Sequence, residues 1–207
     1  MSAGVWGLRP IVSSGVRLAC LDKDGTLVPD LPYNVDPARM ELVPGAEIAL
    51  PLLRRAGYRI VVVSNQPGVA LGRFPESALA AVARRLDELC TGIGVRLAGF
   101  YYCPHAPRSD GSSCACRKPE PGLITRALAE HGARADRSWV VGDILDDVEA
   151  GRRAGCRTAL VDNGNETEWR WSPLRRPDLR VPTLLDAARL IAAPGPGSAE
   201  TWPVAWT

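Results

Sequence analysis

Residues 16–27, V-R-L-A-C-L-D-K-D-G-T-L, contain the pattern from which the fold is predicted. An apolar run over residues 16–21 has the composition of a buried strand, and it ends in Asp22 and Asp24. Gly25 then allows the chain to turn sharply. Two carboxylates this close repel each other unless a cation lies between them or one of them holds a proton. Both conditions suit phosphoryl transfer with Mg²⁺, and a solvated turn is the alternative for the pair taken alone.

Strand-like and helical segments alternate along the rest of the chain. Further strands are expected at residues 58–63, 95–102, 139–142 and 158–161. Helices are expected at residues 44–56, 75–90, 121–130, 146–154 and 183–191. Residues 163–182 have the composition of a loop. The alternation predicts an α/β fold with a parallel sheet of five or more strands and helices on both faces.

The sequence also limits the domain organisation and the compartment. We expect one domain over residues 1–192, without a large cap domain because no long insertion follows the first or second strand, and a flexible tail over residues 193–207. The first 17 residues lack the charged start and apolar centre of a signal peptide, so a cytoplasmic protein is expected. No apolar run approaches the 18 residues that a membrane span needs.

Composition argues against several classes of protein. The 207 residues are 46% hydrophobic and 23% charged, and the formal net charge is +2. A disordered chain would be poorer in apolar residues, and a nucleic-acid-binding domain would be more basic. Lysine is scarce, because only Lys23 and Lys118 occur among the 25 basic residues. The sequence therefore predicts an ordinary globular domain with few candidates for any role that requires lysine.

Three more polar clusters stand beside the expected strands. Ser64 and Asn65 end the second strand, Lys118 precedes a helix, and Asp143 and Asp147 follow the fourth strand. In a parallel α/β sheet, ligands bind beyond the carboxyl ends of the strands. Each cluster taken alone has an ordinary explanation, namely a cap, a solvated lysine or aspartates favoured near a helix N-terminus. Taken together with the first turn, they predict a single phosphate-binding site.

The motifs LDKDGTL, VVVSN, RKPEPG and VGDILDD occur in this order between residues 21 and 147. They resemble those of the haloacid dehalogenase (HAD) superfamily of phosphohydrolases, and the resemblance covers residues 16–162. It implies a Rossmann-like core, with Asp22 as the nucleophile that forms an aspartyl-phosphate and Asp24 as the general acid and base.

The same resemblance implies the ligands of the metal and of the phosphoryl group. Mg²⁺ would be held by the side chain of Asp22, the backbone carbonyl of Asp24 and the side chain of Asp143. The phosphoryl oxygens would be bound by Ser64, Asn65 and Lys118. Asp147 is expected to orient Lys118 or a metal-bound water.

A cysteine-rich loop lies at residues 103–116. Its ends carry Cys103 with His105 and Cys114 with Cys116, and the residues between are polar and typical of turns. Three thiols and one imidazole match a closed tetrahedral Zn²⁺ site, whose metal would supply the cohesion that such a short loop lacks. Free cysteines with a solvated histidine are the alternative.

Within the superfamily, this loop resembles those of the D-glycero-D-manno-heptose-1,7-bisphosphate 7-phosphatases, of the HAD-IIIA type, and of the related histidinol-phosphate phosphatases. The resemblance to the heptose enzymes implies that the substrate of this protein is a small phosphorylated sugar. Substrate contacts are implied at Asp30, Tyr33, Gln66 and Arg117. Arg117 suits a distal phosphate because a guanidinium binds oxyanions with two hydrogen bonds.

Several departures from the pattern leave the exact sugar open. Pro67, Ile144, Lys23 and the short spacing between His105 and Cys114 differ from the heptose enzymes, and no chemical role for Lys23 follows from the sequence. Heptose bisphosphate, histidinol phosphate and other sugar phosphates all remain candidates.

Two functions of other classes are weaker hypotheses. A non-catalytic protein on the same core would be favoured by loss of the nucleophile or the metal aspartate, and both are present. A zinc-ribbon nucleic-acid module is disfavoured because the loop is short and the chain nearly neutral. The expected protein is a monomer that binds neither nucleic acid nor membrane.

Overall fold

The computed structural model describes residues 15–107 and 114–193. The tail predicted over residues 193–207 lies outside the described residues except for Ala193, and so does the centre of the predicted zinc loop. Among the described residues, no helix combines the length and the apolar character that a bilayer crossing requires.

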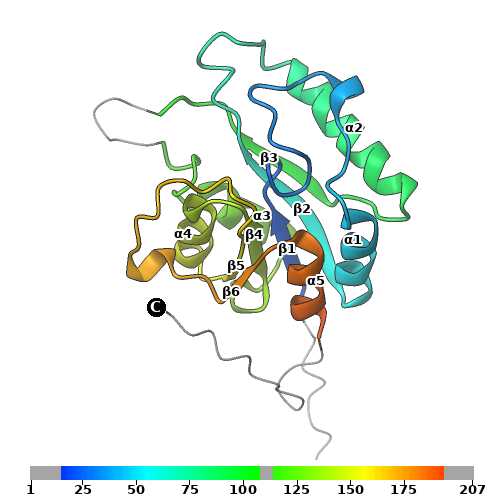
Figure 1. Ribbon diagram of the computed structural model, residues 1–207, viewed down its shortest axis with the longest axis vertical. Helices are drawn as coiled ribbons and strands as arrows, with labels where there is room; N and C mark the ends of the chain where they lie inside the picture. Colours follow the sequence, from blue (N-terminus) through cyan, green and yellow to red (C-terminus); the bar gives the residue numbers. More distant parts are fainter. Residues whose placement is uncertain (1–14, 108–113, 194–207) are drawn as a thin grey trace, which may run out of the picture.

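Within the described residues, six parallel strands form the sheet, in the order β3-β2-β1-β4-β5-β6 (Figure 1). The strands are β1 (Arg17–Leu21), β2 (Tyr58–Asn65), β3 (Gly99–Cys103), β4 (Trp139–Gly142), β5 (Arg157–Val161) and β6 (Leu179–Val181). Because neighbouring strands are parallel throughout, their carboxyl ends meet at the same edge of the sheet. The predicted parallel α/β fold is therefore confirmed.

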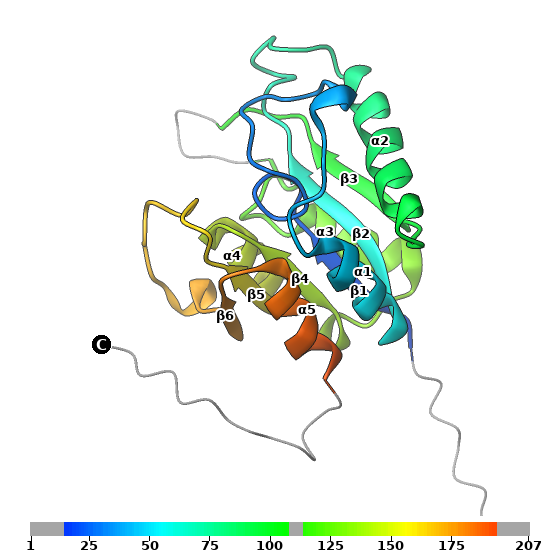
Figure 2. The same ribbon diagram turned by 45° about the vertical axis from the view of Figure 1, so that its right-hand side comes forward.

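Helices cover both faces of the sheet, as predicted (Figure 2). One face carries α1 (Ala46–Arg55), α2 (Ala78–Gly92) and α5 (Leu184–Ala192), and the other carries α3 (Gly122–His131) and α4 (Leu145–Arg153). Short 3-10 turns lie at η1 (Pro37–Arg39), η2 (Ala135–Arg137) and η3 (Pro173–Arg175). Strand β1, in the middle of the sheet, contributes side chains to the hydrophobic core on each face, because successive side chains of a strand point to opposite faces.

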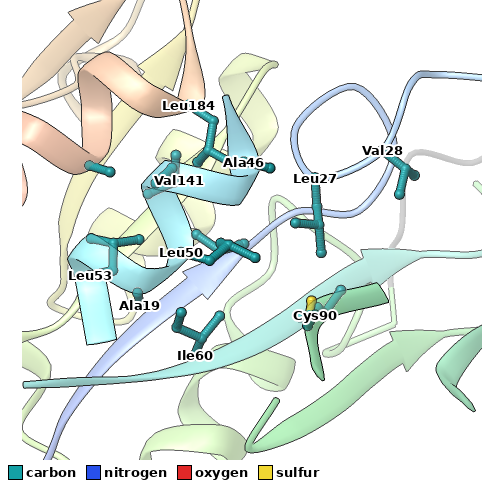
Figure 3. Close-up of a cluster of buried hydrophobic side chains, with 14 of the residues drawn as sticks. Ala19, Leu27, Val28, Ala46, Leu50, Leu53, Ile60, Cys90, Val141 and Leu184 are labelled. Carbon is teal, nitrogen blue, oxygen red and sulfur yellow. The ribbon is translucent and has the colours of Figure 1, made fainter. Parts of the chain in front are cut away.

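The larger core lies under α1, α2 and α5 (Figure 3). Ala19 of β1 and Ile60 of β2 pack there against Leu50 and Leu53 of α1, and each of these side chains is at most 2% exposed. Leu18 and Cys20 pack on the opposite face, against α3. A strand buried on both faces explains why residues 18–21 are all apolar instead of alternating with polar residues.

Two details of the predicted elements are wrong. Residues 163–182, predicted as loop, contain β6, a three-residue edge strand too short to show a period in the sequence. The strand predicted at residues 95–102 begins only at Gly99, although the N–H of Ala98 already donates to the carbonyl of Ile60 at 2.7 Å.

No cap domain is present among the described residues. The connection from β1 to α1 contains η1 as its one helical element, and the connection from β2 to α2 contains none. The polar side chains at the carboxyl edge of the sheet therefore come from its loops, from the end of β2 and from the start of α4.

Candidate active site

The turn after β1 lies at the centre of the carboxyl edge of the sheet. The N–H of Asp22 donates to the carbonyl of Val141 at 2.9 Å, which ties the first acidic residue to β4. Gly25 has a φ of +80°, and a Cβ at this position would collide with the carboxylate of Asp143. Glycine is thus required at this position both for the turn and for the close approach of Asp143, which follows β4.

Three carboxylates from two strand ends converge at this point. Oxygen atoms of Asp22, Asp143 and Asp147 all lie within 4.8 Å of one another. Burial and the charge of Asp22 raise the pKa of Asp143 to about 6, although Asn165 and Thr26 donate hydrogen bonds to it. Such a buried group of like charges requires a cation, and its oxygen ligands are those that Mg²⁺ prefers. The side chains present therefore fit the implied metal.

Lys118 supplies part of the compensating charge. Its ammonium, 3% exposed, donates to Asp22, to Asp147 and, at 2.9 Å, to the carbonyl of Val63. Burial alone would lower the pKa of Lys118, but the charges of Asp147 and Asp22 raise it above its usual value. The ammonium therefore stays protonated beside the predicted nucleophile, in the position that a phosphate-binding cation needs.

The end of β2 holds Lys118 in place. The side-chain amide of Asn65 accepts from the N–H of Lys118 at 3.0 Å and donates to its carbonyl at 3.1 Å. Asn65 therefore positions Lys118 in this structure, and direct binding of phosphate by its side chain stays a prediction. Ser64 is 1% exposed, and its hydroxyl accepts from Gln66 at 2.8 Å.

Asp24 stands at the border between this cluster and solvent. Its side chain is 27% exposed, one oxygen lies 2.8 Å from the ammonium of Lys23, and the other accepts from Gln66 at 3.1 Å. Burial raises the pKa of Asp24 to about 6, with the charge of Asp22 adding to the rise and Lys23 opposing it. A carboxyl that titrates near neutral pH is suited to give and take protons.

A cavity of about 300 Å³ opens beside Asp24. Its lining includes Lys23, Asp24, Asp30, Tyr33, Asn65 and Gln66. The structure thus brings Asp30 and Tyr33 to the site, together with Arg73, whose guanidinium lies 5.5 Å from the centre of the Tyr33 ring. Arg117 does not line this cavity and donates instead to the carbonyl of His105 at 3.3 Å.

The cysteine-rich loop gathers its four predicted ligands. The Sγ atoms of Cys103, Cys114 and Cys116 lie 3.2 to 3.4 Å apart, and the His105 Nδ1 lies 3.4 Å from two of them. Four ligands around one Zn²⁺ stand about 3.7 Å apart, so the arrangement needs little expansion to hold the metal. The N–H of Gly122 donates to the carbonyl of Ala115 at 2.9 Å, which joins the loop to the start of α3.

Comparisons with known proteins agree with this geometry. A family model described as HAD-hydrolase-like matches residues 115–187. The D-glycero-beta-D-manno-heptose-1,7-bisphosphate 7-phosphatase of Pasteurella multocida is 37% identical over 148 residues, covering 70% of this chain and 80% of the relative. The enzyme of the same name from Haemophilus ducreyi is 36% identical over 151 residues, covering 71% and 83%.

The chain belongs to the HAD-like family of phosphatases. A D,D-heptose 1,7-bisphosphate phosphatase from B. bronchiseptica, crystallised with magnesium and phosphate, has a TM-score of 0.74 and 28% identity, covering 85% of this chain and 98% of its own. A HAD-like phosphatase from Mesorhizobium loti has a TM-score of 0.69 and 35% identity, with 86% of each chain covered. The HAD phosphatase fold predicted from the four motifs is confirmed.

Sequence motifs missed several residues that complete this HAD phosphatase site. Asn165 donates to Asp143 at 2.8 Å, and Asn163 donates to the carbonyl of Gly25 at 2.6 Å. Both follow β5, whose carboxyl end reaches the same edge as those of β1 and β4, so the position of the strand was an available signal. Lys23 and Thr26, both buried, have no role in the sequence prediction, because the contacts of Lys23 with Asp24 and of Thr26 with Asp143 depend on the folded turn.

Mg²⁺ is expected to raise the melting temperature of this phosphatase more at pH 7.5 than at pH 5. The pKa of Asp143 rises from its usual value near 4 to about 6 on folding, so without metal the stability it contributes is complete below about pH 4 and is lost as the pH rises through 6. The difference is about 3 kcal/mol at most. Mg²⁺ replaces the missing proton and restores this stability at the higher pH.

Thermal unfolding of protein dialysed free of Mg²⁺, with and without added Mg²⁺ at both pH values, measures this effect. Asp136→Asn, which changes an exposed carboxylate far from the cluster, is the matched control and should behave like the wild type. Asp143→Asn should lose the pH-dependent gain, and a gain equal to that of the wild type in this variant would contradict the prediction.

Proposed function

We propose that this HAD phosphatase removes the C7 phosphate of D-glycero-D-manno-heptose 1,7-bisphosphate, on the way to a nucleotide-activated heptose. One observation carries the catalytic part of the proposal: Lys118 is in contact with Asp22, and Asp24, two residues further on, lines an open cavity. The substrate part is supported by the names of the relatives and by the cysteine–histidine loop that adjoins Lys118 in sequence.

The first step transfers the phosphoryl group to the protein. A carboxylate oxygen of Asp22 attacks phosphorus while the bond from phosphorus to the sugar oxygen breaks, and the electron pair of that bond stays on the sugar oxygen. Asp24 gives this oxygen its proton, so the sugar leaves as an alcohol. The products of this step are an aspartyl-phosphate at residue 22 and an ionised Asp24.

The second step releases phosphate. A water oxygen attacks phosphorus as Asp24 takes one of the water protons, and the bond between phosphorus and the Asp22 oxygen breaks toward the carboxylate. Asp24 is then protonated and Asp22 ionised, as at the start. The balance of the two steps is one phosphate ester and one water consumed, with one alcohol and one inorganic phosphate formed.

Positive charge and hydrogen-bond donors around the phosphoryl group would lower the activation free energy of both steps. Lys118 would turn part of its hydrogen bonding from the carboxylates to the phosphoryl oxygens, with the Ser64 hydroxyl and Asn65 beside it. Asp22, Asp143 and the carbonyl of Asp24 would hold Mg²⁺, which when bound supplies further charge against those oxygens. Asp147 keeps Lys118 oriented from the opposite side.

The rest of the substrate would occupy the cavity next to Asp24. Asp30, Tyr33 and Gln66 are placed to contact sugar hydroxyl groups, because all three line it. Arg117, held at the cysteine-rich loop, would bind the distal phosphate. We further propose that residues 1–192 form a single catalytic domain that acts as a monomer, which sedimentation analysis would test.

The test is phosphate release from a panel of substrates in the presence of Mg²⁺. It includes both anomers of heptose 1,7-bisphosphate, histidinol phosphate and simple hexose phosphates. The highest kcat/KM is expected for a heptose bisphosphate. Preference for histidinol phosphate would overturn the substrate, while no release from any phosphomonoester would overturn the proposed mechanism as a whole.

Purified protein is expected to contain about one zinc per chain, lost in the Cys114→Ser/Cys116→Ser double variant. The serine hydroxyls keep the size of the ligands but bind Zn²⁺ poorly, and the loop then loses the metal that joins its two ends. Elemental analysis after gel filtration measures the zinc. Cys90→Ser, at a buried cysteine outside the loop, is the matched control and should keep its zinc. A fully active wild type without zinc would contradict the prediction.

A further inference from the structure

We propose that Lys23 is a positioning residue for Asp24: its ammonium holds one oxygen of that carboxyl while Gln66 holds the other, so the proton-transferring group points into the substrate cavity. The inference rests on the acid and base role of Asp24 in the proposed function. It assigns a role to Lys23, which lies between Asp22 and Asp24 in the chain.

Lys23 is one of the most completely buried large side chains of the described protein, with 2% of its surface exposed. Its Nζ lies 2.8 Å from Oδ1 of Asp24. Burying an ammonium is strongly unfavourable unless it is paired, and an apolar side chain of the same length would fill the space without that penalty. The charge of Lys23 is therefore best explained by its partner.

The backbone on which Lys23 stands is fixed as well. Its carbonyl accepts from the N–H groups of Leu27 and Val28, each at 2.9 Å, and the N–H of Gly25 donates to the carbonyl of Val28 at 2.8 Å. Leu27 and Val28 are anchored in turn in the larger core (Figure 3). The side chain thus reaches Asp24 from a rigid turn, and the short i, i+1 spacing leaves the ion pair little freedom.

The second oxygen of Asp24 is held from the neighbouring strand. Nε2 of Gln66 donates to Oδ2 of Asp24 at 3.1 Å and to the hydroxyl of Ser64 at 2.8 Å. One donor on each oxygen restricts rotation of the carboxyl about its last bond. The 27% of the Asp24 side chain that remains exposed belongs to the cavity lining, where a substrate ester oxygen would lie.

In the first step of the proposed mechanism, the orientation of Asp24 matters only when the leaving oxygen needs a proton, whereas in the second step it matters for every substrate because Asp24 takes a proton from water. An alkyl phosphate expels a strongly basic alkoxide, so a misplaced acid slows it, because a misplacement of about 1 Å can cost about 100-fold. p-Nitrophenyl phosphate expels a weakly basic phenolate that leaves without protonation. A residue that positions Asp24 should therefore distinguish these two substrates, whereas a residue that only supports the fold should affect both equally.

The experiment compares Lys23→Met, Lys23→Arg and wild type on a hexose 6-phosphate and on p-nitrophenyl phosphate. Because only the first step distinguishes the substrates, release of the sugar or of p-nitrophenolate is followed in a single turnover with protein in excess. For Lys23→Met we expect this rate to fall about 30-fold on the sugar phosphate and less than about 3-fold on p-nitrophenyl phosphate. Lys23→Arg should recover most of the lost rate because it restores a cation beside Asp24. Equal losses on the two substrates, or no loss on either, would overturn the proposal.

Three further variants make the result unambiguous. Arg134→Met removes an exposed ion pair with Asp136 and should leave both rates unchanged. If Lys23→Met fails to fold by circular dichroism, Lys23→Gln takes its place, and the same selective loss is required of it. Asp24→Asn must itself show the selective loss. If it does and the Lys23 variants do not, only the positioning role fails, whereas no selectivity in Asp24→Asn overturns the acid role as well.

Discussion

Asp22→Asn is expected to lower kcat by at least about 10⁴-fold. The amide oxygen of asparagine is a poor nucleophile toward phosphorus and cannot form the mixed anhydride through which the proposed mechanism passes. The substitution keeps the size of the side chain, and the N–H of residue 22 still donates to the carbonyl of Val141. The charge that Asp22 adds to Asp143 and Asp147 disappears, so the fold should not be weakened by it.

The loss of turnover should coincide with loss of the covalent intermediate. Wild-type protein quenched during turnover and treated with borohydride should show reduction of residue 22 by mass spectrometry, and Asp22→Asn should show none. Asp36→Asn, which replaces an exposed aspartate that caps η1, serves as the matched control and should keep its activity. Turnover of Asp22→Asn at the level of the wild type would refute the assignment of the nucleophile.

Lys118→Met is expected to lower kcat by about 10²- to 10³-fold and to destabilise the Mg²⁺-free protein by about 3 to 5 kcal/mol. The ammonium contacts Asp22 and Asp147 at a site only 3% exposed, so its removal leaves two carboxylates without their cation. Lys118→Arg should not restore turnover, since a planar guanidinium cannot replace a compact ammonium among three acceptor oxygens.

A double variant separates the two effects of Lys118. Lys118→Met/Asp147→Asn removes the more deeply buried of the two charges that the single variant leaves unpaired, so urea unfolding should show much of the lost stability recovered. Turnover should stay low, because the ammonium that would face the phosphoryl group is still missing. Recovery of turnover together with stability would show that Lys118 acts only in the fold and would contradict its catalytic role.

Much of this site could be predicted from local patterns in the chain. The polar residues at the carboxyl ends of β1, β2 and β4 were predictable because polar side chains that end a buried apolar run stand out in the sequence, and parallel strands place them at one edge. The four zinc-type ligands were identified because thiols and imidazoles at these spacings have few other uses. The helix boundaries were predicted to within a few residues, and only β6 and the start of β3 were wrong.

The contacts between distant residues could not be predicted in the same way. Asn163 and Gly25 are 138 residues apart, and Lys118 and Asp22 are 96 apart. Asn65 was predicted to bind phosphate, and the structure shows its amide engaged with the backbone of Lys118. The sequence assigned no role to Lys23, because its contact with Asp24 depends on the conformation of the rigid turn in which both residues lie.

The sequence by itself therefore determined the family and the kinds of side chain that meet at the carboxyl edge of the sheet. Both depend on short motifs, each of which is local in the chain. Only the tertiary structure decided which donor contacts which carboxylate. Lys23 and Gln66 contact Asp24, Asn165 donates to Asp143, and Lys118 donates to Asp147. The physical reason is that a hydrogen bond depends on distances of a few tenths of an ångström. Between strands far apart in the chain, the packing of the whole sheet and its helices sets those distances.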